Sequence, residues 1–244
     1  IILPESVKDI GVTAFGNCAG LTSVSISIYA ANIGDRAFSG CNLIKTATVP
    51  ANAITTIPKN SLESVTLLNG NTLPSGAFAN GSNLTTVSLP TTITSIEDRA
   101  FYGCSKITRI TIPAGVKSIG ANTFAGCTKL VDITIPNAVS SIGLGAFASC
   151  ESLTKITIPT TIANLSNNMF DGCINLAQVT INNSETTIGS SVFKNCEKLI
   201  DITYRGSIEN WKDLKKGSSW NDNTGEYIVN CTNGKINKQG NPVK

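Results

Sequence analysis

The cysteines are the residues whose spacing most directly suggests chemistry, because thiols can form disulfides or bind metal ions. Seven of the eight lie three residues after a phenylalanine, namely Cys18, Cys41, Cys104, Cys127, Cys150, Cys173 and Cys196. If these positions stack in successive turns of the chain, their side chains run in parallel, so they neither all pair nor enclose a tetrahedral metal. We therefore expect small buried apolar side chains, an unpaired Cys231, and no metal or other cofactor.

A second candidate site combines charged and hydroxyl side chains at one place in three consecutive repeats. Each charged residue lies two positions before a threonine, and the six candidate ligand-binding residues are Arg109, Thr111, Asp132, Thr134, Lys155 and Thr157. One interpretation is a solvated row of ion pairs beside a column of strand-forming threonines. The other is the centre of a recognition patch for a protein or a glycan.

Composition excludes several function classes. The chain has no histidine, which removes Ser-His-Asp triads and histidine-ligated zinc. The net charge of +3 is too small to indicate nucleic acid as a partner. No apolar run approaches the roughly 18 residues that a membrane-spanning helix needs. Asp132 has basic neighbours rather than a second carboxylate, so we expect no enzymatic activity.

The elements that would position these residues follow from a repeat. All eight phenylalanines form one series, Phe15, Phe38, Phe78, Phe101, Phe124, Phe147, Phe170 and Phe193, and six of the seven gaps are 23 residues. An unvarying period in this range indicates a solenoid, because one coil cannot bury its apolar residues alone whereas stacked coils can.

Each coil is expected to contribute one short strand and a turn on the opposite, convex side. Alternating β-branched residues such as Ile110 and Ile112 predict the strand, a following proline ends it, and an Ile-Gly step predicts the next bend. The A-F-x-x-C segment predicts a short 3-10 or helical turn. Ten strands of one parallel sheet are expected, near residues 1–3, 24–26, 47–49, 65–67, 87–89, 110–112, 133–135, 156–158, 179–181 and 202–204.

The pattern also divides the chain. Residues 1–204 form the predicted solenoid, with one shortened coil near 50–67 that omits the Phe-Cys segment. Residues 205–236 are expected to form a C-terminal cap with a helix around Trp211 and a strand from Tyr227 to Cys231. Residues 237–244 are expected to be a disordered tail. Because the chain begins inside a strand, we expect an N-terminal cap or earlier repeats to precede it.

The unit L-x-x-I-x-I-P-x-x-V-x-x-I-G-x-x-A-F-x-x-C resembles the BspA-like, or Treponema pallidum-type, leucine-rich repeats over residues 1 to about 204. The resemblance implies a right-handed leucine-rich-repeat superhelix that is secreted or displayed on a cell surface. It also implies a role in adhesion, since members of the family are associated with binding matrix proteins or other microbes.

Three functional hypotheses remain open. The first is a monomeric, non-catalytic adhesion module that binds a host extracellular protein, another cell-surface protein or a glycan through its concave sheet. The second is a passive spacer that projects another domain. The third is a polysaccharide-active enzyme, for which the charged triplet is the sole support.

Overall fold

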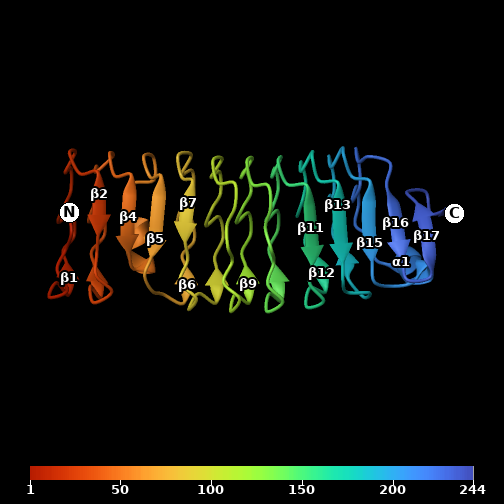
Figure 1. Ribbon diagram of the computed structural model, residues 1–244, viewed down its shortest axis with the longest axis horizontal. Helices are drawn as coiled ribbons and strands as arrows, with labels where there is room; N and C mark the ends of the chain where they lie inside the picture. Colours follow the sequence, from red (N-terminus) through yellow and green to blue (C-terminus); the bar gives the residue numbers. More distant parts are fainter. Residues whose placement is uncertain (244) are drawn as a thin grey trace.

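The computed structural model describes residues 1–243 as a row of coils stacked along one long axis, with the two ends of the chain at opposite ends of the row (Figure 1). Strands of successive coils pair in parallel and in register, so that Ile156 lies beside Val179 and Val179 beside Ile202. The predicted solenoid of parallel strands is therefore confirmed.

The longer strands form one side of the coils, which we call the long-strand face. It contains two sheets, β2-β4-β5-β7 and β11-β13-β15-β16-β17-β18. Their strands are β2 (Ser23–Ser25), β4 (Thr46–Val49), β5 (Ser64–Leu67), β7 (Thr86–Ser88), β11 (Lys155–Ile158), β13 (Gln178–Ile181), β15 (Asp201–Tyr204), β16 (Ile228–Cys231), β17 (Gly234–Asn237) and β18 (Pro242–Val243).

The long-strand face is interrupted between these two sheets, which differs from the prediction of a single continuous sheet. Residues 110–112 and 133–135, both expected to be strands, form none, and one isolated bridge between Arg109 and Asp132 is the pairing that remains there. We call residues 109–112 and 132–135 together the open segment. In Figure 1 it is the yellow-green and green part of the row, where the upper half of the coils carries no arrows.

A second ladder of two-residue strands lies on another side of the coils. Its strands are β1 (Asp9–Ile10), β3 (Asn32–Ile33), β6 (Thr72–Leu73), β8 (Ser95–Ile96), β9 (Ser118–Ile119), β10 (Ser141–Ile142), β12 (Asn164–Leu165) and β14 (Thr187–Ile188). The order β10-β9-β8-β6 is unbroken. It therefore joins the coils where the long-strand face is open.

The glycines that follow this ladder keep coils close together, which corrects their expected role as bends. A Cβ atom on Gly120 would lie 2.5 Å from the backbone nitrogen of Asp98 and 2.6 Å from the carbonyl carbon of Glu97, both in the preceding coil. Real Cβ atoms do not approach backbone so closely. Glycine is needed here because it has no side chain, and not because the backbone turns sharply.

The phenylalanines form the internal column that the repeat predicts. From Phe78 to Phe193 each ring stacks on the next, with centroids 5.1 to 5.7 Å apart. The stack is interrupted between Phe38 and Phe78, because the short coil carries no phenylalanine. Its buried Ala53, Ile54 and Ile57 join the core instead.

The segments around the phenylalanines differ from the predicted 3-10 or helical turns. They are hydrogen-bonded turns in which the residue two positions after the ring has a positive φ, as at Gly103 (69°) and Asn80 (60°). The short coil contains a 3-10 helix instead, η1 (Ala51–Thr56). Lys59 donates hydrogen bonds to the Ile54 and Thr55 carbonyls at the end of η1. Burial lowers the pKa of Lys59 to about 8.

The C-terminal end is closed by the predicted helix and strand. Helix α1 (Ile208–Asp213) starts with a reciprocal capping box between Ser207 and Asn210, and β16 pairs with β15. The predicted disorder from residue 237 is wrong for the described residues, because β18 pairs antiparallel with β17 and its backbone groups gain partners there. Lys244, the last residue of that expected tail, lies outside the described residues.

Candidate functional site

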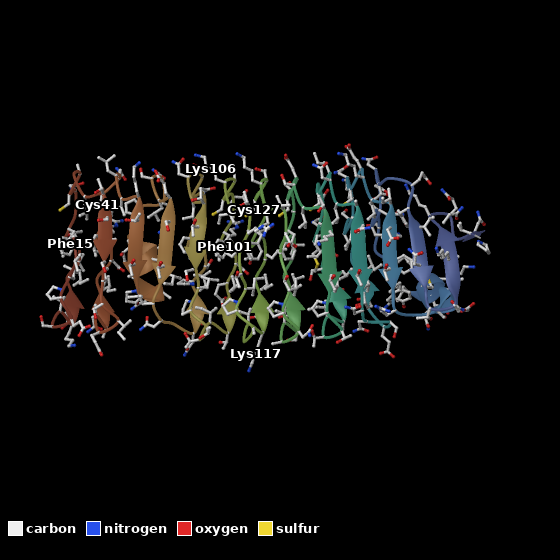
Figure 2. All side chains as sticks on the ribbon, in the orientation of Figure 1. Phe15, Cys41, Phe101, Lys106, Lys117 and Cys127 are labelled. Atoms are coloured by element: carbon white, nitrogen blue, oxygen red, sulfur yellow. The ribbon has the colours of Figure 1, made fainter. Side chains whose placement is uncertain are left out.

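The cysteines line up beside the phenylalanine column, and their thiols act as hydrogen-bond donors. The Phe101 carbonyl accepts one hydrogen bond from the Cys104 amide in its own coil (3.1 Å) and one from the Cys127 thiol in the next coil (3.2 Å). Figure 2 labels Phe101 and Cys127 in adjacent coils. The same thiol-to-carbonyl contact joins Cys41, Cys104, Cys150, Cys173 and Cys196 to the phenylalanine of the preceding phenylalanine-bearing coil.

The two exceptions in this series have a structural reason. Gly81 replaces cysteine in the coil that directly follows the short coil, and the short coil offers no phenylalanine carbonyl to a thiol at that position. The Cys18 side chain is exposed, and within the described residues its thiol makes no such contact. A thiol is therefore buried in this row where a phenylalanine carbonyl lies one coil before it.

The thiol row shows no feature of a reactive site. All eight cysteines are free, six of the seven in the repeats are buried, and Cys231 is unpaired as expected. Burial raises the pKa of the Cys104 thiol to about 12 and that of Cys127 well above its ordinary value, so both are protonated at neutral pH. The prediction of buried side chains is confirmed for these six and wrong for Cys18, and their role as donors was missed.

The six candidate ligand-binding residues lie together on the outer surface of the open segment and of β11. Arg109, Lys155 and the three threonines are exposed, and Asp132 is half-buried. Lys106 and Lys117 extend from opposite edges of nearby coils and are not part of this group (Figure 2).

The charges of this patch remain unpaired, contrary to the ion-pair interpretation. Within the described residues the salt bridges are Lys45–Glu63 and Lys238–Glu226, and neither involves the patch. Arg109, Asp132 and Lys155 therefore keep their full capacity to interact with groups outside the chain.

Two shallow hollows run between the coils at these residues. One, of about 440 Å³, is lined by Arg109, Thr111, Asp132 and Thr134 together with core isoleucines. The other, of about 430 Å³, lies one coil further and is lined by Asp132, Thr134, Lys155 and Thr157. Each hollow combines charged ends, hydroxyl groups and an apolar floor, which suits a polar ligand with an apolar side.

The floor of the hollows shows why they exist. Ile110 is 8% exposed and Ile112 6%, whereas Val179 and Ile181, their equivalents in the paired strand β13, are fully buried. Backbone pairing draws adjacent coils together over such side chains, and its absence leaves them partly open. Charge and hydroxyl patterns identified the patch from the sequence, but no sequence signal indicated the hollows.

The described residues contain no helix with the length and hydropathy to cross a membrane. They also contain no group of three potential metal ligands among cysteine, aspartate and glutamate.

Solved structures of other leucine-rich repeat proteins are similar to this architecture. The chain is similar to a leucine-rich repeat protein from Bacteroides ovatus (23% identity, TM-score 0.63), covering 94% of this chain and 70% of that one. It is also similar to the pneumococcal vaccine antigen PcpA (18% identity, TM-score 0.53, 94% and 78%). The T. pallidum leucine-rich repeat protein is 24% identical, with a TM-score of 0.48 and coverage of 82% and 77%. No curated protein matches.

The match to a repeat family is more specific than these structural likenesses. Six copies of the BspA-type leucine-rich repeat region match residues 1–76 and 71–200, which together form most of the coil stack described above. The chain belongs to the BspA-type leucine-rich repeat family.

Proposed function

We propose that this protein is a non-catalytic adhesion module that binds an extracellular protein through the long-strand face, with the open segment at the centre of the contact. The observation that carries the proposal is the coincidence of three unpaired charges with two hollows at the same residues. Leucine-rich repeat proteins generally mediate protein–protein interactions, and their extended surfaces suit large partners.

The charge order favours a partner with the complementary order. Arg109, Asp132 and Lys155 stand one coil apart from one another as positive, negative and positive groups. A partner that presents acidic, basic and acidic side chains at that spacing would pair all three, and wrong partners would be opposed by like charges. Location outside the cell and a monomeric state belong to the same proposal.

The test is a binding screen of purified extracellular-matrix proteins against the wild-type chain and a charge-reversal variant (Arg109→Glu, Asp132→Lys, Lys155→Glu). We expect at least one partner whose affinity falls at least tenfold in this variant. The matched control exchanges the charges of the surface pair (Lys45→Glu, Glu63→Lys) and should bind as the wild type does. Unchanged binding by the triple variant would exclude the open segment as the contact.

The alternatives predict other results. A passive spacer would bind none of the proteins screened. An acidic-polysaccharide enzyme would release reducing ends, and Asp132→Ala would abolish that release.

A further inference from the structure

The short coil creates a third hollow, distant in sequence from the patch above. It has a volume of about 430 Å³ and lies beyond the ends of β2, β4 and β5, where η1 replaces the usual turn. Ile28, Pro50 and Pro74 give it apolar surface, and Asn52, Asn69 and Asn71 give it carboxamides. No charged residue lines it.

The carboxamides of this hollow are available to a ligand. The backbone carbonyls of Asn69 and Asn71 accept hydrogen bonds from Ala51 and Thr94, which fixes their place, while within the described residues their side chains have no partner. The Asn52 amide makes one long contact, 3.5 Å, with the Ala31 carbonyl. A carboxamide both donates and accepts, so three of them can serve neighbouring hydroxyl groups of one ligand.

Strands β2, β4 and β5, which end beside this hollow, and their neighbour β7 carry an array of hydroxyl groups. Two residues of each strand point outward, and all eight are serine or threonine in register, forming the columns Ser23, Thr46, Ser64, Thr86 and Ser25, Thr48, Thr66, Ser88. Every one of them is exposed or half-buried. Successive residues within each column lie about 4.8 Å apart, the distance between neighbouring strands. The two columns therefore form a flat, uncharged, hydrogen-bonding surface.

We propose that this hollow and the hydroxyl columns bind an uncharged polysaccharide chain, with one pyranose ring in the hollow and further rings along the columns. The apolar floor matches the C–H face of a pyranose, and the carboxamides match its hydroxyl groups. A phosphate, sulfate or carboxylate ligand would find no cation in the hollow, and an amine would find no carboxylate. This surface is separate from the open segment, so the proposal does not depend on the proposed function.

The test is affinity electrophoresis of the full chain in gels that contain a soluble neutral polysaccharide: a β-glucan, a mannan or a xylan. We expect at least one of them to retard the wild-type chain. The double variant Asn69→Ala/Asn71→Ala should weaken that binding at least tenfold. Thr48→Val/Thr66→Val, which removes two hydroxyl groups and keeps β-branched side chains, should weaken it several-fold.

Matched variants distinguish binding at this site from binding elsewhere on the long-strand face. Thr180→Val/Thr203→Val makes the same change on β13 and β15 and should bind as the wild type does, and thermal unfolding of each variant verifies its fold. Asn71→Asp keeps the shape and adds a charge, and it should also lose binding. Retardation by none of the three polysaccharides, or equal retardation of all variants, would overturn the proposal.

Discussion

Two neighbouring stretches with almost the same sequence adopt different structures in this molecule. Residues 107–113 read I-T-R-I-T-I-P and residues 153–159 read L-T-K-I-T-I-P. The second contains β11, which pairs with β13 along four residues, whereas the first contains a single bridge residue, Arg109. The local sequence therefore gives each coil the capacity to form a strand. Whether that strand pairs depends on how the rest of its coil contacts the adjacent coil.

The second ladder indicates what holds the coils. It is continuous from β6 to β10, in the coils that contain the open segment. Strand β12 pairs instead with β14, in the coils that carry the sheet starting at β11. Coils in the centre are therefore joined along that ladder and along the phenylalanine turns, while their long-strand sides share only the one bridge between Arg109 and Asp132 within the described residues. Backbone pairing between neighbouring coils is therefore distributed over several sides of the coil and is incomplete on the long-strand side at the centre.

The largest expected difference concerns the core beneath the two stretches. Ile158→Ala in β11 should lower the free energy of unfolding by about 4 kcal/mol, since its fully buried side chain leaves a cavity that paired coils cannot close. Ile135→Ala, at the equivalent position in the open segment, should cost about 2 kcal/mol because its side chain is 5% exposed and the unpaired coils can close over part of the cavity. Urea unfolding measures both, and equal losses would contradict the comparison.

Amide hydrogen exchange addresses the backbone directly. Amides of residues 110–112 and 133–135 should exchange about 100-fold faster than those of β11 and β13, because unpaired amides need no opening of a ladder before exchange. Mass spectrometry of peptic peptides can resolve the two stretches. Similar protection in both would mean that the open segment is closed in solution.

The thiol row should stabilise both stretches alike, since the same thiol-to-carbonyl contact recurs in the coils of both. Cys127→Ala should lower the free energy of unfolding by about 1 to 2 kcal/mol, because it removes a buried sulfur and the donor to the Phe101 carbonyl. Cys18→Ala, at an exposed site, should change it by less than about 0.5 kcal/mol. Thermal unfolding of both variants provides the measurement, and an equal effect would remove the assigned role of the donor.

The smallest expected effects come from surface charge. Glu63→Gln should cost at most about 1 kcal/mol, since Glu63 forms an exposed ion pair with Lys45 at 2.9 Å. Asp132→Asn in the open segment should leave stability unchanged within about 0.5 kcal/mol because Asp132 has no such partner among the described residues. Urea unfolding at low and high salt would distinguish them, and a clear loss for Asp132→Asn would reveal an ion pair in solution.

Most of the architecture could be predicted from the sequence because it is repetitive. The phenylalanine period fixed the coil length, and the 17-residue excess between Phe38 and Phe78 located the short coil. The outer position of the charged triplet also followed from period-two alternation. Pairing between coils could not be predicted, because residues 110–112 have the same strand-forming sequence as residues 156–158.

The details that escaped prediction share one cause. The Ile-Gly step suggested a bend, while Gly120 in fact makes room for the coil before it. The cysteines suggested small apolar side chains that only pack in the core, while their thiols also donate hydrogen bonds to a carbonyl 26 residues earlier. Contacts between residues one coil apart leave little trace in a single sequence, since the chemistry belongs to the pair. The short β18 strand was missed because it depends on β17 as a partner.

The link from each thiol to the coil before it has a consequence for how such an array can change in length. Duplicating a complete 23-residue unit supplies both a phenylalanine backbone carbonyl and the thiol that donates to it. Each added coil therefore forms this hydrogen bond with its neighbour. A shortened unit, as at residues 50–67, lacks the phenylalanine carbonyl, so a thiol in the next coil would have no acceptor. In this chain that next coil has Gly81 in place of cysteine. Lineages of these proteins should therefore vary by whole units far more readily than by partial ones, and each partial unit should be followed by a substituted cysteine.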